Sequence, residues 1–306
     1  MAITAKDVAE LRAKTGIGMM ECKKALTEAN GDMDEAIKIL REKGMAVADK
    51  KASRIAAEGI VSIYSDGTKT AMIEVNSETD FVAKNASFQE FVNGLLKTII
   101  ETGVADVDAL LAAKFTGEDR TVDEVLKEKI FTIGEKLTIR RFVVVDGISS
   151  SYVHGGGTIG VIVTGETETD NDDVHAILKN VALQIAAMEP EYLNRGEVPA
   201  SVVEEEKGII LEQMKNDPKM AGKPETVLDG IVMGKIGKFY SKVCLLEQEY
   251  VKDEALTVEK YVATAAKEAG VACAVKSFVI YKKGEGLQKR EENFAEEIAK
   301  LTGAQK

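Results

Sequence analysis

Carboxylates are concentrated at one place in the sequence where a general acid and a general base could meet. Glu74, Glu78 and Asp80 lie within the stretch "EVNSETD", between a predicted strand and a predicted helix. Two such groups could share acid/base work, but charged side chains at a corner are usually solvated. Asp80 also suits the N-cap of the following helix, with Phe81 as its first residue. We therefore favour a solvated acidic corner over a catalytic pair.

A glycine-rich stretch suggests a second chemistry, nucleotide binding. Gly155, Gly157 and Gly160 have the GxGxxG spacing, which binds dinucleotides when a helix follows the glycines. Here "IGVIV" follows, and this stretch predicts a strand. The glycines are better explained by a hairpin turn with positive φ angles. The sequence also lacks a GxxxxGK[ST] motif, so we expect no phosphate-binding loop.

Residues that usually support catalysis or bind metals are sparse. The chain has 2 histidines, His154 and His175, and 3 cysteines without a CxxC pair. No nucleophile or second histidine is close to His154 in the sequence, so we find no triad. The separated cysteines predict reduced thiols rather than disulfides or a zinc site. We expect no cofactor, no metal and no covalent chemistry.

Composition limits the compartment and the partners. The 306 residues are 45% hydrophobic and 30% charged, which is typical of a soluble globular protein of about two domains. The net charge of −11 argues against direct nucleic-acid binding, which requires a basic face. We find no signal peptide and no apolar run near the ~20 residues of a membrane span. We expect a cytoplasmic protein that does not enter a membrane.

The elements that position these residues predict an α+β fold, beginning with helices. Short amphipathic helices predict a small N-terminal helical domain over residues 1–44. Thr4 caps its first helix and Gly44 ends its last. A partly helical linker follows over 45–58.

Two similar units then form the predicted core. The first, 59–148, has the order strand, turn, strand, "ETDFV", helix. The second covers 149–198 and 241–284, and has the order strand, glycine turn, strand, "ETDND", helix. In the second unit we predict later strands at Ser241–Val251 and near its end. This common order indicates an internal duplication.

Two further helical segments complete the predicted architecture. An antiparallel helical hairpin is inserted into the second unit over 199–240, around a dense turn signal. A terminal helix in 285–306 carries Phe294, Ile298 and Leu301.

Phe81 is the residue that these elements do not explain. It stands among charged residues at a strand-to-helix corner, and the duplicated stretch has Asn171 at the aligned position. A ring required only by the fold would occur in both copies. We infer that Phe81 contacts something outside the chain, which favours a binding protein over an enzyme.

Several stretches resemble the elongation factor Ts family, and together they span most of the chain. These stretches are "ELRAKTGIGMMECKKAL", "EANGDMDEAI", "EVNSETDFVAKN", "IGEKLTIRR" and "YVHGGGTIGVIV". The resemblance implies a guanine-nucleotide exchange factor that promotes GDP release from elongation factor Tu during translation elongation. It also implies a three-helix UBA-like N-terminal domain, a two-part α/β core, a coiled-coil hairpin and a C-terminal helical module.

The resemblance also implies a set of partner-binding residues. In "TDFV", Asp80 and Phe81, flanked by Thr79 and Val82, would reach the GTPase near its magnesium site. The others implied to lie at the interface are Arg12, Met19, Met20 and His154. Because Met19 and Met20 are neighbours on a helix, we expect one to pack inward and one outward. The stretch "TGETETDNDD" is more acidic than the family leads us to expect.

Two other functions remain open from the residues alone. A small hydrolase could use the acidic corner and His154, although no nucleophile is positioned for it. A scaffold protein could dimerise through the hairpin at 199–240. The resemblance itself leaves a homodimer or a 2:2 complex with elongation factor Tu open.

Overall fold

The N-terminal helices surround a small core of their own. The computed structural model describes residues 3–220 and 223–288, and begins with α1 (Ala5–Thr15), α2 (Met19–Glu28) and α3 (Met33–Lys51). The Thr4 hydroxyl accepts a hydrogen bond from the Asp7 N–H, which confirms the predicted cap. The core of these helices contains Leu11, Cys22, Ala25, Leu26, Ala36 and Leu40.

The prediction that Gly44 ends the third helix is wrong. α3 continues to Lys51, and Gly44 is buried within it. Phe131 of α7 (Val122–Ile133) lies against Gly44 and also packs on the N-terminal core. This packing between helices outweighs the low helix propensity of glycine, so the helix does not stop there.

The first core unit is a 3-stranded antiparallel sheet covered on one face by helices. Its strands are β1 (Glu58–Ser65), β2 (Lys69–Ser77) and β3 (Leu137–Asp146), in the order β1-β2-β3. The covering helices include α5 (Ala86–Thr102), α6 (Val107–Ala112) and α7. The predicted order of two strands followed by a helix is confirmed in this unit.

The second core unit repeats this plan. Its sheet is formed by β4 (Ser149–His154), β5 (Ile159–Glu166) and β8 (Ala274–Lys282), in the order β4-β5-β8. It is covered by α8 (Asp172–Met188) and α11 (Val258–Ala269). The middle strands β2 and β5 both change register at a bulge, four residues before "ETD" in each copy. A shared strand order and a shared bulge position are what an internal duplication requires.

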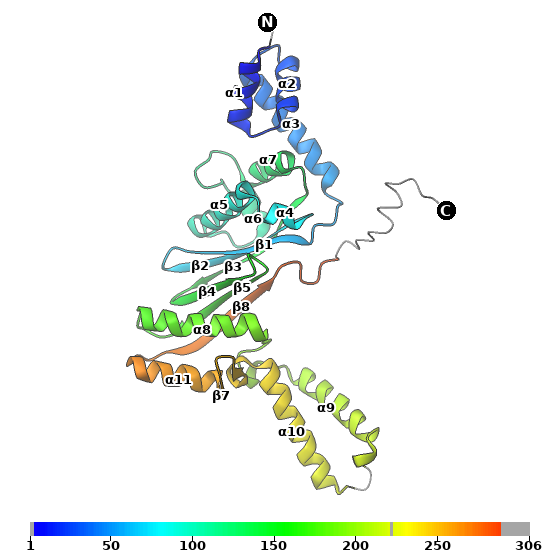
Figure 1. The fold of residues 1–306 in the computed structure, drawn as a ribbon, viewed down its shortest axis with the longest axis vertical. Helices are drawn as coiled ribbons and strands as arrows, with labels where there is room; N and C mark the ends of the chain where they lie inside the picture. The colour runs from blue at the N-terminus through cyan, green and yellow to red at the C-terminus, as the bar shows by residue number, and fades with distance from the viewer. Residues whose placement is uncertain (1–2, 221–222, 289–306) are drawn as a thin grey trace, which may run out of the picture.

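The two sheets face each other, with their helices on the outside (Figure 1). A cluster formed by Val61, Met72 and Ile162 lies between them. Gly160 allows the sheets to approach closely, because a Cβ there would lie 2.4 Å from Val61 Cγ1. The glycine stretch is therefore a hairpin turn and a packing site, as predicted, and it is followed by β5.

The chain leaves the core beside the point where it enters. After β8, Lys283 forms an ion pair with Glu58, the first residue of β1. Gly284, at φ +68°, lies so close to Ala57 that a Cβ would be 2.3 Å from the Ala57 carbonyl oxygen. Only glycine fits this crossing without strain.

Helices α9 (Ala200–Lys215) and α10 (Glu225–Val243) form a hairpin that projects from the second unit (Figure 1). They contact each other through Ile210, Met214 and Ile236. Short 3₁₀ turns occur at Arg195–Glu197, Pro218–Met220 and Leu245–Glu247.

The predicted strand at Ser241–Val251 is wrong over most of its length. α10 extends to Val243, and only Glu249–Tyr250 forms a strand, β6, which pairs with β7 (Asp253–Thr257). Val243, Cys244 and Leu245 are buried at the end of a helix and in a turn, and a short apolar run does not distinguish these from a strand.

The predicted terminal helix with Phe294, Ile298 and Leu301 lies outside the described residues. Across residues 3–220 and 223–288, no helix is both long and apolar enough to cross a membrane.

Candidate partner-binding site

A short helix, α4 (Asp80–Ala83), places Phe81 and Val82 in opposite environments. The Phe81 side chain is 77% exposed, whereas Val82 is 7% exposed and packs in the core of the first unit. Neighbouring residues on a helix point in different directions, so the buried valine directs the ring into solvent. This is the exposed ring that the sequence predicted.

The prediction that Asp80 is the N-cap is wrong. Thr79 holds the cap position, and Asp80 is the first residue of α4. The Asp80 carboxylate forms an ion pair with Lys84 at 3.1 Å, and both side chains are largely exposed, so the pair contributes little stability. Thr79 does not cap the helix with its side chain, because its hydroxyl donates to Glu135 at 2.6 Å. Sequence reasoning missed Glu135, although it lies in the quoted "IGEKLTIRR" stretch.

The second unit has no counterpart of α4. Asn171 caps α8 by accepting a hydrogen bond from the Val174 N–H, and Asn85 caps α5 in the same manner. Asn171 therefore corresponds structurally to Asn85, not to Phe81 as the sequence alignment of the copies predicted. α4 is an additional turn in the first unit, and Phe81 lies on it.

The prediction of a solvated acidic corner is wrong for Glu74, which is fully buried. Its carboxylate accepts hydrogen bonds from Arg140 at 2.9 Å, Arg141 at 2.7 Å and the Gly284 N–H at 2.8 Å. Burial acts to raise the pKa of Glu74, but these hydrogen bonds together hold the pKa below its ordinary value. Glu74 therefore joins the first unit to the end of the second, and is not available for acid/base work.

His154 lies at the end of β4, beside an exposed hairpin turn. One ring nitrogen, Nδ1, is 3.0 Å from the Tyr152 hydroxyl. The turn contacts β1 where the Gly157 carbonyl accepts a hydrogen bond from the Val61 N–H at 2.8 Å. This contact is close to Glu58, which pairs with Ser77 directly before the α4 corner. The structure thus brings the His154 turn and the α4 corner to the same end of β1.

Arg12, Met19 and Met20 lie on the N-terminal helices, separate from α4 (Figure 1). Arg12 is exposed in the last turn of α1. Both methionines at the start of α2 are exposed, Met20 by 66%, so the expectation that one packs inward is wrong. Cys22, Ala25 and Leu26 fill the inner face of α2 instead.

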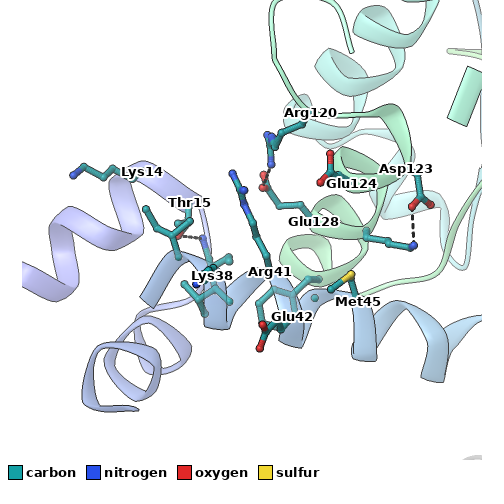
Figure 2. A pocket seen from close by; sticks show the side chains of 16 residues that line it. Lys14, Thr15, Lys38, Arg41, Glu42, Met45, Arg120, Asp123, Glu124 and Glu128 are labelled. Carbon is teal, nitrogen blue, oxygen red and sulfur yellow. Dashed lines mark hydrogen bonds and ion pairs between the residues drawn. The ribbon is translucent and has the colours of Figure 1, made fainter. Parts of the chain in front are cut away.

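A pocket of about 450 Å³ lies between the N-terminal helices and α7 (Figure 2). Its walls include Lys38, Arg41 and Met45 of α3 and an ion pair between Lys127 and Asp123 of α7. Charges of both signs line it. The residues implied to contact the partner are not among its lining residues.

The 3 cysteines are free, as predicted from their spacing. Cys22 and Cys244 are also buried. Burial raises the pKa of the Cys244 thiol to about 11. This cysteine is therefore a packing residue and not a reactive thiolate.

Sequence comparisons with known proteins point to one family. A family model described as "Elongation factor TS" matches residues 78–285. Elongation factor Ts of Syntrophotalea carbinolica is 50% identical over 306 residues, covering 99% of this chain and 100% of that protein. Elongation factor Ts of Clostridium botulinum strain Alaska E43 is 46% identical over 306 residues, covering 98% and 99%. Elongation factor Ts of Clostridium kluyveri strain ATCC 8527 is 45% identical over 304 residues, covering 97% and 98%.

An α+β chain whose sequence matches these proteins along their whole length falls in a defined class of protein, the translation elongation factors. Within that class, the chain belongs to the elongation factor Ts family.

Proposed function

We propose that this chain is a guanine-nucleotide exchange factor that binds elongation factor Tu with GDP and promotes GDP release. Asp80 and Phe81 enter the GTPase near its magnesium and phosphate site, and Arg12, Met19, Met20 and His154 provide further contacts. The observation that carries the proposal is Phe81: a ring 77% exposed, on a turn that the second unit lacks, in a chain of this family.

The free energies involved indicate that Phe81 disturbs the nucleotide site and does not simply compete with GDP. Burying one phenylalanine gives about 1.5–3 kcal/mol, whereas a nucleotide bound at nanomolar affinity is held by about 12 kcal/mol. The ring alone cannot displace GDP. It disturbs the magnesium and phosphate ligands while the rest of the interface supplies the binding energy. By linkage, the factor weakens GDP binding by the same ratio by which GDP weakens binding of the factor.

The separation of the exposed residues supports a macromolecular partner. Phe81 and Met20 lie on different units, so one small ligand does not reach both (Figure 1). A protein surface that spans the N-terminal helices and the core does. A macromolecular partner is therefore favoured over a small ligand.

A nucleotide-release assay tests the proposal. Fluorescent GDP is loaded on purified elongation factor Tu, and its release is followed by stopped flow with and without this chain. We expect strong acceleration at catalytic amounts of the factor. The chain alone should bind neither GDP nor GTP in calorimetry, because it has no phosphate-binding loop motif. Unchanged release, or micromolar nucleotide affinity of the free chain, contradicts the proposal.

A further inference from the structure

Glu135, in the loop between α7 and β3, accepts hydrogen bonds from Thr79, the residue directly before α4. Thr79 donates from its backbone N–H to Glu135 Oε2 at 3.0 Å and from its hydroxyl to Glu135 Oε1 at 2.6 Å. The Thr79 carbonyl accepts a hydrogen bond from the Ser77 hydroxyl at 2.8 Å. The polar groups of Thr79 are thus all engaged, and both oxygens of Glu135 are used on one residue. The backbone is fixed directly before Asp80.

A reciprocal contact ties the same two segments together. Glu78 Oε1 accepts a hydrogen bond from the Lys136 N–H at 2.6 Å and lies 3.2 Å from Arg54. The Lys136 ammonium in turn donates to the Arg54 carbonyl at 2.9 Å. Each segment therefore offers a carboxylate to a backbone N–H of the other. Two such contacts determine the position of the corner more strictly than one.

The Phe81 ring depends on this support for its position. It belongs to none of the hydrophobic clusters formed by the described residues, so its direction follows from the turn beneath it. At the corresponding corner of the second unit, the Thr169 N–H donates instead to the Thr167 hydroxyl at 3.1 Å, and Asp170 lies 2.7 Å from His175 Nε2. The contact of Glu135 with Thr79 therefore occurs in the unit that has α4, and the second unit forms the same strand order without it.

We propose that Glu135 is a positioning residue for exchange. It holds Thr79 so that Phe81 is already in the orientation that the GTPase requires, which removes the cost of ordering the turn during exchange. This inference rests on the proposed function. The further claim is that loss of Glu135 slows GDP release more than it weakens binding to elongation factor Tu.

The first test needs no partner. The chain has no tryptophan, so Phe81→Trp introduces a single tryptophan on the turn, which can be excited selectively over the 7 tyrosines. We expect lower fluorescence anisotropy of this residue when Glu135→Ala is added. Glu101→Ala is the matched control, because Glu101 also accepts a threonine hydroxyl, from Thr116 at 2.7 Å, away from α4. If Phe81→Trp has the same anisotropy with and without Glu135→Ala, the inference is overturned.

The second test separates rate from affinity. GDP release from elongation factor Tu is measured over a range of factor concentrations. For Glu135→Ala we expect a maximal rate about tenfold lower, with the half-saturating concentration changed by less than about threefold. Glu135→Gln keeps one acceptor and should recover most of the rate. Thr79→Val should lower the maximal rate less than Glu135→Ala does. Combining the two substitutions should lower the rate little further than Glu135→Ala alone. Glu101→Ala should release GDP normally.

The outcomes distinguish the two proposals. If the wild-type chain does not accelerate GDP release while anisotropy still falls in Glu135→Ala, the proposed function fails and the ordering of the turn by Glu135 does not. If Phe81→Ala is slow but Glu135→Ala is normal, the inference fails alone. A fall in the Glu101→Ala rate equal to that of Glu135→Ala shows general destabilisation and also overturns it. Urea unfolding of Glu135→Ala itself checks for a folding defect, and Glu135→Gln serves as the conservative variant.

Discussion

At the scale of single residues, α4 places two adjacent side chains in opposite environments. Val82 anchors the turn in the core, and Phe81 is the apolar side chain on its exposed side. The backbone of the turn is the same for both. A substitution at either residue can therefore serve as the control for a substitution at the other.

We predict that Phe81→Ala and Val82→Ala have opposite effects. Phe81→Ala should cost the free chain little, well below the ~3–5 kcal/mol of a buried phenylalanine, yet slow GDP release about ten- to hundredfold. Val82→Ala should cost about 2 kcal/mol of unfolding free energy. The measurements are urea unfolding and stopped-flow GDP release. If Phe81→Ala unfolds readily while exchange per folded molecule is normal, the ring serves the fold.

The sequence predicted the exposure of Phe81, but part of the reasoning behind it was wrong. Asn171, its aligned residue, is a helix cap, so the copies differ by a whole turn and not by one side chain. Glu135 could not be found by pattern, because its contact with Thr79 joins segments 56 residues apart. Glu74 was placed in solvent for a similar reason, since its arginine partners lie on β3. Short-range signals do not report contacts of this kind.

At the scale of elements, α3 connects the N-terminal helices to the core. It is continuous through Gly44 to Lys51, and Phe131 of α7 packs on both Gly44 and the N-terminal core. Lys51 also donates to the Gly134 carbonyl, just beyond α7. The orientation of Arg12 and Met20 relative to α4 is thus set by helix packing and not by a free linker.

We predict that Phe131→Ala loosens this connection without unfolding the core. The N-terminal helices should lose about 1–2 kcal/mol of protection, because an aromatic contact with their small core is removed. Hydrogen exchange of α1 and α2, compared with that of α5, measures the change. Affinity for elongation factor Tu should fall more than the maximal release rate. Equal loss of protection in α5 would show that Phe131 supports the core instead.

The α9–α10 hairpin is separate from α4, and none of the residues implied to contact the partner lies on it. We predict that replacing residues 202–238 with a short turn keeps substantial exchange activity. Self-association should change instead, because apolar side chains such as Met233, which is 69% exposed, are removed. Analytical ultracentrifugation and the release assay measure the two effects. Complete loss of exchange in a well-folded variant would contradict this.

Long amphipathic helices and hairpin strands were predictable from their periodicity, and irregular junctions were not. α5, with Phe88, Phe91 and Leu95 at helical spacing, was recognised. The end of α10 was mistaken for a strand because Val243, Cys244 and Leu245 are buried one after another. Whether such a run is helix, turn or strand depends on what it packs against, here Tyr192 and Val198.

At the scale of the whole molecule, buried charge links the two halves. Glu74 accepts hydrogen bonds from Arg140 and Arg141 of β3 and from Gly284 beyond β8, and Arg141 also pairs with Glu285 at 3.3 Å. The apolar contact between the sheets would bury an unpaired charge if this network were incomplete. Removing one partner of a buried ion pair lowers the free energy of unfolding more than replacing the whole pair with apolar residues does.

We predict that this network makes stability depend on pH. The pKa of Glu74 is lowered on folding from its ordinary value of 4.5. Its stabilising contribution is therefore complete above pH 4.5 and is lost as pH falls through the lower, folded value. Glu74→Gln should show a weaker fall in unfolding free energy in acid, and Glu74→Ala should cost about 3 kcal/mol at neutral pH. Urea unfolding across this range measures both. An identical acid dependence in Glu74→Gln would show that other carboxylates cause it.

The adjacent entry and exit of the core have a consequence for chain connectivity. Because Gly284 lies against Ala57 and Lys283 pairs with Glu58, the duplicated core is topologically almost a closed ring. A few added residues would join its ends, and new termini could open at an exposed hairpin tip such as Asp66–Gly67. Such a circular permutant would keep every strand pairing while moving the N-terminal helices to another site. It would show whether they must emerge beside α4 for exchange, or need only be attached to the same molecule.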